Sequence, residues 1–297
     1  MQKQGLNGPA VTQLDTPFLT SVPRTKATAT LHEWQTDVLA AASATNAVLE
    51  GDDATTDAVT ATTRLSNTCQ ISDKVPRITG TQQAVVSAGR KDELAYQIVK
   101  SAKELRRDME SSLLANNAEV TGDTTNAREL GGIEAWINTN TVVGATGTAG
   151  SLGNTARVDG TNIALTEALL KQVLKSCWDN GGDPDCVMTG SFNKTVVSGF
   201  TGNATRFKSA EDNKLMAAID IYQSDFGELE IIPNRFQVAE SNLVLQKDMW
   251  AVGYLRPVQI TNLAKTGDSE RRQIIVEYTL ESRNEKASGA VFDTLTA

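Results

Sequence analysis

The sequence has few of the residues from which most active sites are built. Its 297 residues include one histidine, His32, and three cysteines, Cys69, Cys177 and Cys186. A Ser-His-Asp or Cys-His nucleophile system would depend on this one imidazole, which lies in a polar, strand-like segment beside Glu33. We interpret His32 as a surface or interface residue, and we assign no residue a catalytic role.

The cysteines form neither a metal-binding nor a disulfide pattern. Zinc sites need paired ligands at short spacing, whereas Cys177 and Cys186 are separated by a turn-forming segment that contains Gly-Gly-Asp-Pro. A sparse, odd set of cysteines is typical of proteins made in a reducing cytosol. We expect all three to be small buried hydrophobic side chains, and we expect no metal ion or cofactor.

Long apolar runs are also missing. No run approaches the roughly 20 apolar residues of a membrane-spanning helix. The N-terminal segment MQKQGLNGPAVTQLDTPFLTSVPRTK lacks the apolar core of a secretory signal. The sequence therefore predicts no membrane association and a protein that stays inside the cell that makes it.

Positive charge is in deficit. The net charge is −8 and the pI is near 4.9, which argues against a dedicated nucleic-acid binder, because such binding needs Lys and Arg to displace counterions from phosphates. The glycine-rich segment 144–153, GATGTAGSLG, lacks the Lys-Ser/Thr of a phosphate-binding P-loop and is interpreted as a loop.

Two segments near the N-terminus are expected to need a partner surface. Residues 1–27 contain three prolines and little periodicity, which favours an extended arm that serves assembly more than folding. Residues 28–75 contain two strand-like runs, ATATLHEWQTDVL and TTRLSNTCQISDKV, around a small-residue, acidic middle. An isolated two-stranded hairpin is marginally stable in water, so this projection is expected to contact another surface.

Residues 90–116 are expected to form one long helix of about 40 Å. Leucine, isoleucine, methionine and alanine recur there at helical spacing, which predicts one buried stripe facing the C-terminal sheet; the stripe is Leu94, Ile98, Ala102, Leu105, Met109 and Leu113. The same helix carries a basic patch of Lys100, Lys103, Arg106 and Arg107, which is expected to be neutralised within the helix by Glu104, Asp108 and Glu110.

The remainder alternates between helices and strands. A helix is expected over 165–179, a short buried strand at CVMTG (186–190) and a further helix at SFNKTVVSGF (191–200). The run IIVEYTLES (274–282) alternates apolar and polar residues, and it follows a hairpin that turns at Gly267. The resulting order predicts an α+β fold.

One acidic cluster remains open to two interpretations. Glu50, Asp52, Asp53 and Asp57 lie within eight residues, with no basic residue nearby in the sequence. They form either a solvated loop or an inter-subunit contact with basic groups of a neighbour. The basic candidates for such a contact are Lys103, Arg106, Arg107, Arg271 and Arg272.

Five blocks of the sequence, in their order, resemble the major capsid (major head) proteins of tailed phages, which have the HK-ninety-seven-type fold. The blocks are HEWQTD at 32–37, RLSNTCQISDKV at 64–75, ELAYQIVKSAKELRRDMESSLL at 93–114, WDNGGDPDCVMTG at 178–190 and LRPVQITNLAKTGDSERRQIIVEYTLE at 255–281. They span nearly the whole chain.

The resemblance implies both a division of the chain and a function. The implied parts are an N-terminal arm at 1–27, an extended loop at 28–75, a peripheral domain at 76–157 with the spine helix 90–116, an axial domain at 158–245, and return strands of the peripheral domain at 246–297. The implied function is an icosahedral head shell of hexamers and pentamers, assembled in the bacterial cytoplasm. Its implied partners are a portal, a scaffold or decoration protein, and packaged double-stranded DNA without sequence-specific binding.

Two other functions remain as alternatives at this stage. One is a hydrolase with a site in 158–245, which the shortage of histidine disfavours. The other is a different structural protein, such as a tail-tube or surface-layer subunit.

Overall fold

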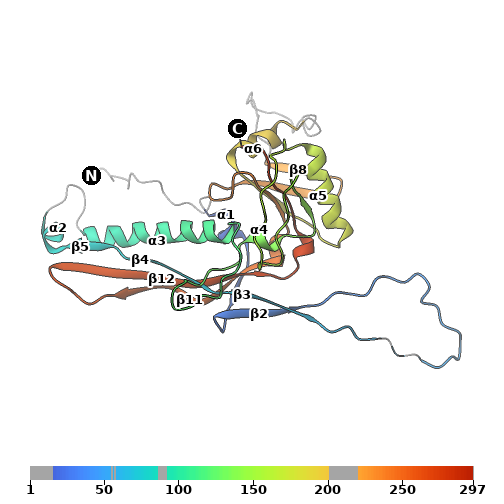
Figure 1. The fold of residues 1–297 in the computed structure, drawn as a ribbon, viewed down its shortest axis with the longest axis horizontal. Coiled ribbons are helices and arrows are strands. Elements are labelled where there is room, and N and C mark those ends of the chain that lie inside the picture. Colours follow the sequence, from blue (N-terminus) through green and yellow to red (C-terminus); the bar gives the residue numbers. More distant parts are fainter. Residues whose placement is uncertain (1–15, 55, 57, 86–91, 201–219, 297) are drawn as a thin grey trace, which may run out of the picture.

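The computed structural model describes residues 16–54, 56, 58–85, 92–200 and 220–296. The molecule is elongated, with a compact region of helices and strands, a long sheet on one side of it and a projecting ribbon on the other (Figure 1). The fold is α+β, as the sequence predicts. No helix among these residues is long and apolar enough to cross a membrane.

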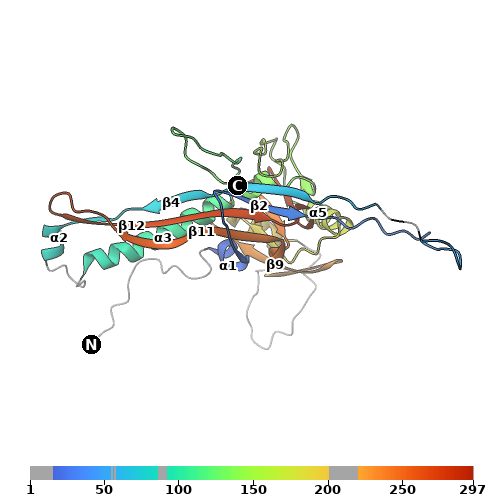
Figure 2. The same cartoon turned by 90° about the horizontal axis from the view of Figure 1, so that it is seen from below.

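The long sheet has five strands and lies beside α3 (Glu93–Leu113). Seen from below, α3 and the strands run together along the long axis (Figure 2). The strand order is β1 (Arg24–Lys26), β11 (Trp250–Asn262), β12 (Ser269–Ser282) and β4 (Gln70–Lys74), and β5 (Arg77–Thr79) pairs with the outer end of β12. The β11–β12 hairpin turns at Gly267, whose φ of 81° suits glycine, as expected.

The buried stripe of α3 packs where the sequence predicts. Leu105, Met109 and Leu113 belong to one core cluster with Ile274 and Tyr278 of β12. The helix begins after Asp92, whose carboxylate accepts a hydrogen bond from the Ala95 amide at 3.1 Å, a typical N-cap. It ends at Leu113, three residues before the predicted Asn116.

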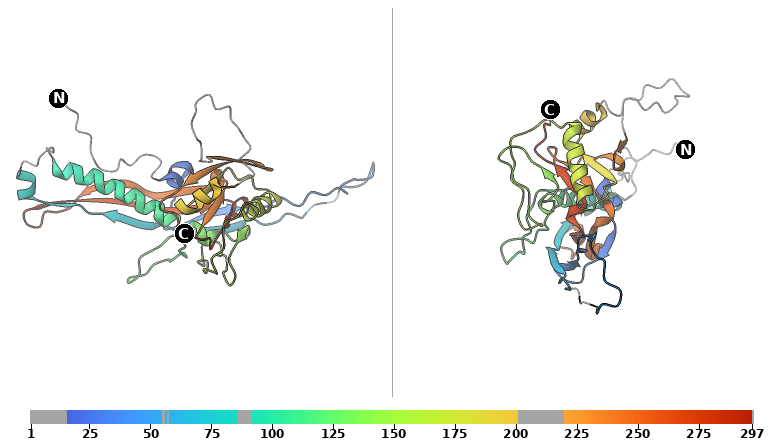
Figure 3. Two further views of the ribbon diagram at one scale, coloured as in Figure 1. Left: turned by 90° about the horizontal axis from the view of Figure 1, so that it is seen from above. Right: turned by 90° about the vertical axis from the view of Figure 1, so that its right-hand side faces the viewer.

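A second sheet has six strands in the order β6-β13-β10-β7-β9-β8, and an end-on view separates it, with α5 beside it, from the ribbon below (Figure 3). Its central strands are buried because α5 and α6 cover them through a second apolar cluster. The strands are β6 (Thr141–Val142), β7 (Cys186–Thr189), β8 (Ile221–Ser224), β9 (Gly227–Pro233), β10 (Asn242–Leu245) and β13 (Gly289–Val291). The helices α5 (Glu167–Asp179) and α6 (Ser191–Ser198) confirm the two predicted there.

Short helices complete the body. They are α2 (Gly80–Ala84), α4 (Ile133–Trp136), and the 3-10 turns η3 (Lys247–Met249) and η4 (Glu285–Ala287). The segment 144–153 is a loop with isolated bridges, as expected. All three cysteines are buried and free, and burial raises the pKa of the Cys69 thiol to about 11, so these are packing residues.

The expectation that residues 1–27 form an extended arm that serves assembly more than folding is wrong for residues 16–27; residues 1–15 lie outside the described part. Residues Pro17–Ser21 form the helix α1, whose Phe18 and Leu19 are buried in the same core as α3. Strand β1 then pairs in parallel with β11. Proline is compatible with the first position of a helix, and a five-residue helix is too short to show periodicity.

Removing residues 1–27 is therefore expected to unfold the subunit rather than leave a folded monomer. Truncating Phe18 alone to alanine should cost about 3–5 kcal/mol, because it is fully buried. Circular dichroism of the truncated chain would check this, and a native spectrum with an unchanged melting temperature would contradict it.

Candidate inter-subunit surfaces and the junctions that position them

A two-stranded ribbon projects from the body. Strands β2 (Leu31–Thr36) and β3 (Thr63–Thr68) pair antiparallel, from Leu31 opposite Thr68 to Thr36 opposite Thr63. They form a separate sheet among the described residues, although β3 continues through Cys69 into β4 of the long sheet. Side-chain contacts also hold the base of the ribbon. Beyond it, the loop 37–62 extends far from the body (Figure 1), which confirms the predicted projection.

The loop exposes apolar side chains that the rest of the described chain does not cover. Five of them are between 79% and 97% exposed: Val38, Leu39, Val48, Leu49 and Val59. Isolated exposed apolar residues are normal on protein surfaces, but a series of them on one projecting segment indicates a contact surface.

The base of the ribbon is held by His32 and Glu281. The imidazole Nε2 of His32 lies 3.0 Å from Oε2 of Glu281, and the same carboxylate accepts hydrogen bonds from Thr25 at 2.9 Å and from Arg283 at 3.1 Å. It thus joins β1, β2 and β12. His32 is buried, so the interpretation of His32 as a surface residue is wrong: alternation along β2 turns it toward the body.

Two further side chains fix the ribbon. The amide of Asn67 in β3 donates to the carbonyls of Gly131 and Leu280 and accepts from the Gly131 amide at 2.8 Å. The indole of Trp34 in β2 donates to the Ser282 carbonyl at 2.7 Å and packs against Trp136 in a tilted arrangement, with a centroid distance of 5.5 Å. These hydrogen bonds join β2 and β3 to the body of the subunit, and because hydrogen bonds are directional they help to fix the orientation of the ribbon.

Glu281 is expected to make part of the stability depend on pH. Burial alone would raise the pKa of its carboxyl, but hydrogen bonds from His32, Arg283 and Thr25 outweigh burial and lower it from 4.5 to about 2. A lowered carboxyl pKa contributes stability that is present above the unfolded value and is lost as pH falls through the folded value. The stabilisation, about 3 kcal/mol at neutral pH, should disappear between pH 4.5 and 2.

The measurement is urea unfolding of wild type and Glu281→Gln at several pH values. The difference between them should shrink as pH falls through that window. Glu50→Gln, on the exposed loop, is the matched control. A Glu281→Gln difference that stays constant with pH would contradict the assignment.

The predicted acidic tip lies at the far part of the loop. Glu50, Asp52 and Asp53 are exposed, beside a turn in which the Asp52 amide donates to the Leu49 carbonyl and Gly51 has a φ of 87°. Asp57 lies outside the described residues. The predicted basic residues of α3 and β12 lie on the other side of the body (Figure 1), so the structure does not bring the two sets together within one subunit.

The five basic residues that were predicted to meet the acidic tip contact other groups within their own subunit or are partly buried. Arg106 lies 3.5 Å from the Thr16 hydroxyl, the Arg107 guanidinium sits 5.1 Å from the centroid of the Phe236 ring, and Arg272 pairs with Glu270 at 3.6 Å. Lys103 is half-buried. Arg271 donates to Thr266 and to the Ala264 carbonyl.

The predicted neutralisation of the basic patch by acidic residues of α3 is found for one ion pair in that helix. Lys100 and Glu104 are 3.8 Å apart, but Asp108 pairs with Lys74 of β4 at 2.7 Å. Glu110 is fully buried, so its predicted surface role is wrong: helical periodicity places it toward α1 rather than toward the lysines.

Glu110 connects α3 to the N-terminal helix α1. Its carboxylate accepts hydrogen bonds from the amides of Phe18 and Leu19, both at 2.8 Å, and from the Asn234 side chain at 2.7 Å. Burial raises the pKa of this carboxyl despite these bonds. The junction ties the start of the described chain to the six-stranded sheet, and the sequence carried no pattern that predicts it.

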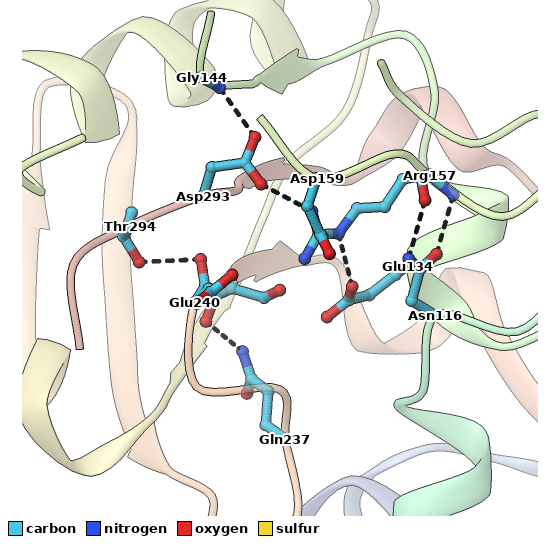
Figure 4. A network of polar contacts seen from close by, with 10 residues as sticks. Asn116, Glu134, Gly144, Arg157, Asp159, Gln237, Glu240, Asp293 and Thr294 are labelled. Atoms are coloured by element: carbon cyan, nitrogen blue, oxygen red, sulfur yellow. Dashed lines mark hydrogen bonds and ion pairs between the residues drawn. The ribbon is translucent and has the colours of Figure 1, made fainter. Parts of the chain in front are cut away.

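A second buried junction centres on Arg157 (Figure 4). Its guanidinium binds Glu134 at 2.7 Å and Asp293 at 2.8 Å, both carboxylates being fully buried, and also the exposed Asp159 at 2.7 Å. It lies 4.7 Å from the centroid of the Phe292 ring. The cation therefore holds α4, the 144–163 segment and the C-terminal segment together.

The surroundings of Arg157 complete this junction. Asn116 exchanges two hydrogen bonds with the Arg157 backbone, and Asp293 accepts from the Gly144 amide at 2.9 Å. Burial raises the pKa of the Glu134 carboxyl, although Ser241 and Arg157 lower it. Carboxylate oxygens of Asp159, Glu240 and Asp293 lie within 4.8 Å of one another, and Arg157 pairs with Asp159 and Asp293 of these three.

Comparison with known proteins agrees with this architecture. Residues 10–295 match the family model of the SU10 major capsid protein. The major capsid protein of Escherichia phage Phieco32 is 28% identical over 315 residues, covering 94% of this chain and 90% of that protein.

Solved capsid structures share the fold at low sequence identity. The capsid of cyanophage A-1(L) superposes with a TM-score of 0.68 at 14% identity, covering 100% of this chain and 98% of that chain. The capsid of a native GTA particle gives 0.61 at 12% identity, covering 99% and 95%. With an α+β fold of the HK-ninety-seven type and a family match over nearly its full length, the chain belongs to the SU10 major capsid protein family, whose members form capsid shells.

Proposed function

We propose that this protein self-assembles through non-covalent contacts into the hexamers and pentamers of an icosahedral head, which encloses the double-stranded DNA of a tailed phage. The observation that carries the proposal is the projecting ribbon, whose loop exposes apolar side chains that no other part of the chain within the described residues covers. In a closed shell many weak contacts add up through multivalency.

We assign the parts of the chain accordingly. Residues 1–27 are the N-terminal arm, 28–75 the extended loop and 76–157 the peripheral domain with α3 as its spine. Residues 158–245 are the axial domain, and 246–297 return to the peripheral domain. The arm has a double role in this assignment, because its residues 16–27 also complete the core.

The expected partners are copies of itself, a portal, and a scaffold or decoration protein, with assembly in the cytoplasm of the bacterial host. Packaged DNA would be enclosed without sequence-specific binding. The chain carries 36 acidic against 28 basic residues, so it has no excess of positive charge with which to bind phosphates.

Electron microscopy of overexpressed protein tests the proposal. Closed polyhedra support a head shell, whereas tubes or flat lattices would support a tail-tube or surface-layer subunit. The comparisons give the hydrolase alternative no support. It would return only if purified protein showed an activity that the variant His32→Ala loses while remaining folded.

Salt dependence tests the acidic tip as an inter-subunit contact. Exposed ion pairs contribute about 0–1 kcal/mol each and are screened over about 10 Å at 0.1 M salt, but every subunit of a shell repeats them. Replacing Asp52, Asp53 and Asp57 by asparagine is therefore expected to shift the salt concentration at which shells form or come apart. Light scattering against salt concentration measures this, and a curve identical to wild type would leave only a solvated loop.

A further inference from the structure

Two aromatic side chains are exposed beside each other at the surface next to the six-stranded sheet. Trp178 is the penultimate residue of α5, and Phe226 lies in the turn between β8 and β9. Their rings are tilted by 31° with centroids 5.6 Å apart, and the two residues are 57% and 37% exposed. Trp136 and Trp250, in contrast, are buried in the core. An exposed tryptophan in contact with a second aromatic ring is typical of the anchor residues of protein interfaces.

Exposed carboxylates flank this aromatic pair. Asp179 directly follows the tryptophan, Asp225 directly precedes the phenylalanine, and Glu228 lies two residues after it. Asp183 belongs to the same surface, because its Oδ1 lies 3.9 Å from where a β-carbon on Gly227 would stand. All four acidic residues are exposed. The two rings and these four carboxylates together form the aromatic–acidic patch.

The positive charges near the aromatic–acidic patch already have partners. Lys171 of α5 pairs with Glu167 at 2.9 Å and also lies near Asp225, and Lys175 pairs with Asp179. The carboxylates of the patch other than Asp179 form no ion pair with any residue that the structure describes. With Glu167 included, five carboxylates meet two ammonium groups, which leaves a net charge of −3 on this part of the described surface.

The aromatic–acidic patch matches the chemistry of an arginine side chain. A guanidinium placed over the face of a tryptophan ring is attracted by the negative electrostatic potential of that face. Its N–H groups point outward in its plane, where carboxylates beside the ring can accept hydrogen bonds from them. Nucleic acid is disfavoured as the occupant, because its phosphates would be repelled. The acidic loop 37–62 of another subunit would be repelled for the same reason.

We propose that the aromatic–acidic patch binds a basic, arginine-bearing segment of a second kind of polypeptide. A guanidinium of that segment stacks on Trp178, and the carboxylates of Asp179 and Asp225 accept its hydrogen bonds. Another copy of this chain is a poor source of such a segment, since each copy carries a net charge of −8. The inference goes beyond the proposed function, because the patch is complete within one subunit and binding to it needs no closed shell.

Binding of short synthetic peptides to the unassembled subunit tests the proposal. Fluorescence anisotropy at about 0.1 M salt compares labelled peptides that alternate alanine with arginine, lysine or glutamate. The arginine peptide is expected to bind roughly threefold more tightly than the lysine peptide, and the glutamate peptide is expected not to bind. Trp178→Leu should raise the Kd for the arginine peptide roughly tenfold, and Asp225→Asn roughly threefold. Equal binding of the arginine and lysine peptides, or an unchanged Kd in Trp178→Leu, would overturn the proposal.

Matched substitutions separate the patch from general effects. Phe226→Leu removes a ring of the patch and should weaken binding, whereas Phe192→Leu removes an equally exposed ring on α6 and should not. Replacing Asp52 and Asp53 of the acidic tip by asparagine removes exposed charge elsewhere and should leave the Kd unchanged. Equal weakening by the patch and control variants would show that the peptide follows net charge alone, which rejects the patch as its site.

Shell formation tests whether another copy of the chain is the occupant instead. Trp178→Leu is expected to form shells at the same subunit concentration as wild type, measured by light scattering. A higher concentration would assign the patch to a contact between copies and would contradict the proposal. If wild type itself makes no closed shells, the proposed function fails, but peptide binding to the subunit still decides this inference, so the two failures are distinguishable.

Discussion

Replacing Arg157 with methionine is expected to lower the free energy of unfolding of the subunit by about 3–5 kcal/mol. Glu134 and Asp293 are both fully buried, and without the guanidinium two carboxylates would remain in the interior with no countercharge. Urea unfolding of the unassembled subunit, followed by circular dichroism, measures the loss. The deficit should shrink as pH falls, because burial raises the pKa of the Glu134 carboxyl and its protonation removes one uncompensated charge.

A control variant distinguishes the loss of a buried ion pair from the loss of an exposed one. Lys175→Met removes the cation of the exposed Lys175–Asp179 pair of α5 and should cost at most about 1 kcal/mol. Adding Glu134→Gln and Asp293→Asn to Arg157→Met should recover part of the loss. If Arg157→Met costs no more than Lys175→Met, the junction does not stabilise the fold.

Replacing Leu105 with aspartate is expected to be similarly severe. Leu105 is 1% exposed and belongs to the core cluster between α3 and β12. The substitution removes its packing and buries an unpaired carboxylate, at a cost of about 3–5 kcal/mol. Insoluble or degraded protein is the expected outcome, measured as the soluble fraction and the melting temperature.

The same helix provides the control. Val99 is 55% exposed, so Val99→Asp makes the same type of change on the solvent side of α3 and should alter stability by less than about 0.5 kcal/mol. A Leu105→Asp variant that assembles with an unchanged melting temperature would show that this face of α3 does not form the core.

Elements with a repeated pattern were predictable from the sequence. The stripe from Leu94 to Leu113 predicted α3 and the sheet that it covers, and the alternation in 274–282 predicted the inner half of β12. Turn residues such as Gly267 marked the hairpin. These predictions succeed because periodicity and turn chemistry are local properties that a single segment carries by itself.

The order of the five sequence blocks was also enough to identify the family of tailed-phage major capsid proteins. By contrast, the candidate contact surfaces were predictable only in part. The acidic tip was visible as a run of carboxylates, but the cavity at the outer end of the long sheet is made by segments from three parts of the chain, around Ile78, Leu94 and Lys265. No local pattern connects them, since their meeting depends on how β5, α3 and β12 pack.

The α+β class, the long helix, the projecting loop and the shortage of catalytic groups all follow from the sequence, because each depends on residue types or on spacing within one segment. Packing of distant segments brings Phe18 and Leu19 into the core, turns His32 toward Glu281 and places Arg157 between Glu134 and Asp293. The partners in these contacts are 23 to 249 residues apart. A single residue in the sequence carries no signal of a partner so far away along the chain. Its burial becomes favourable only once the surrounding segments have packed around it.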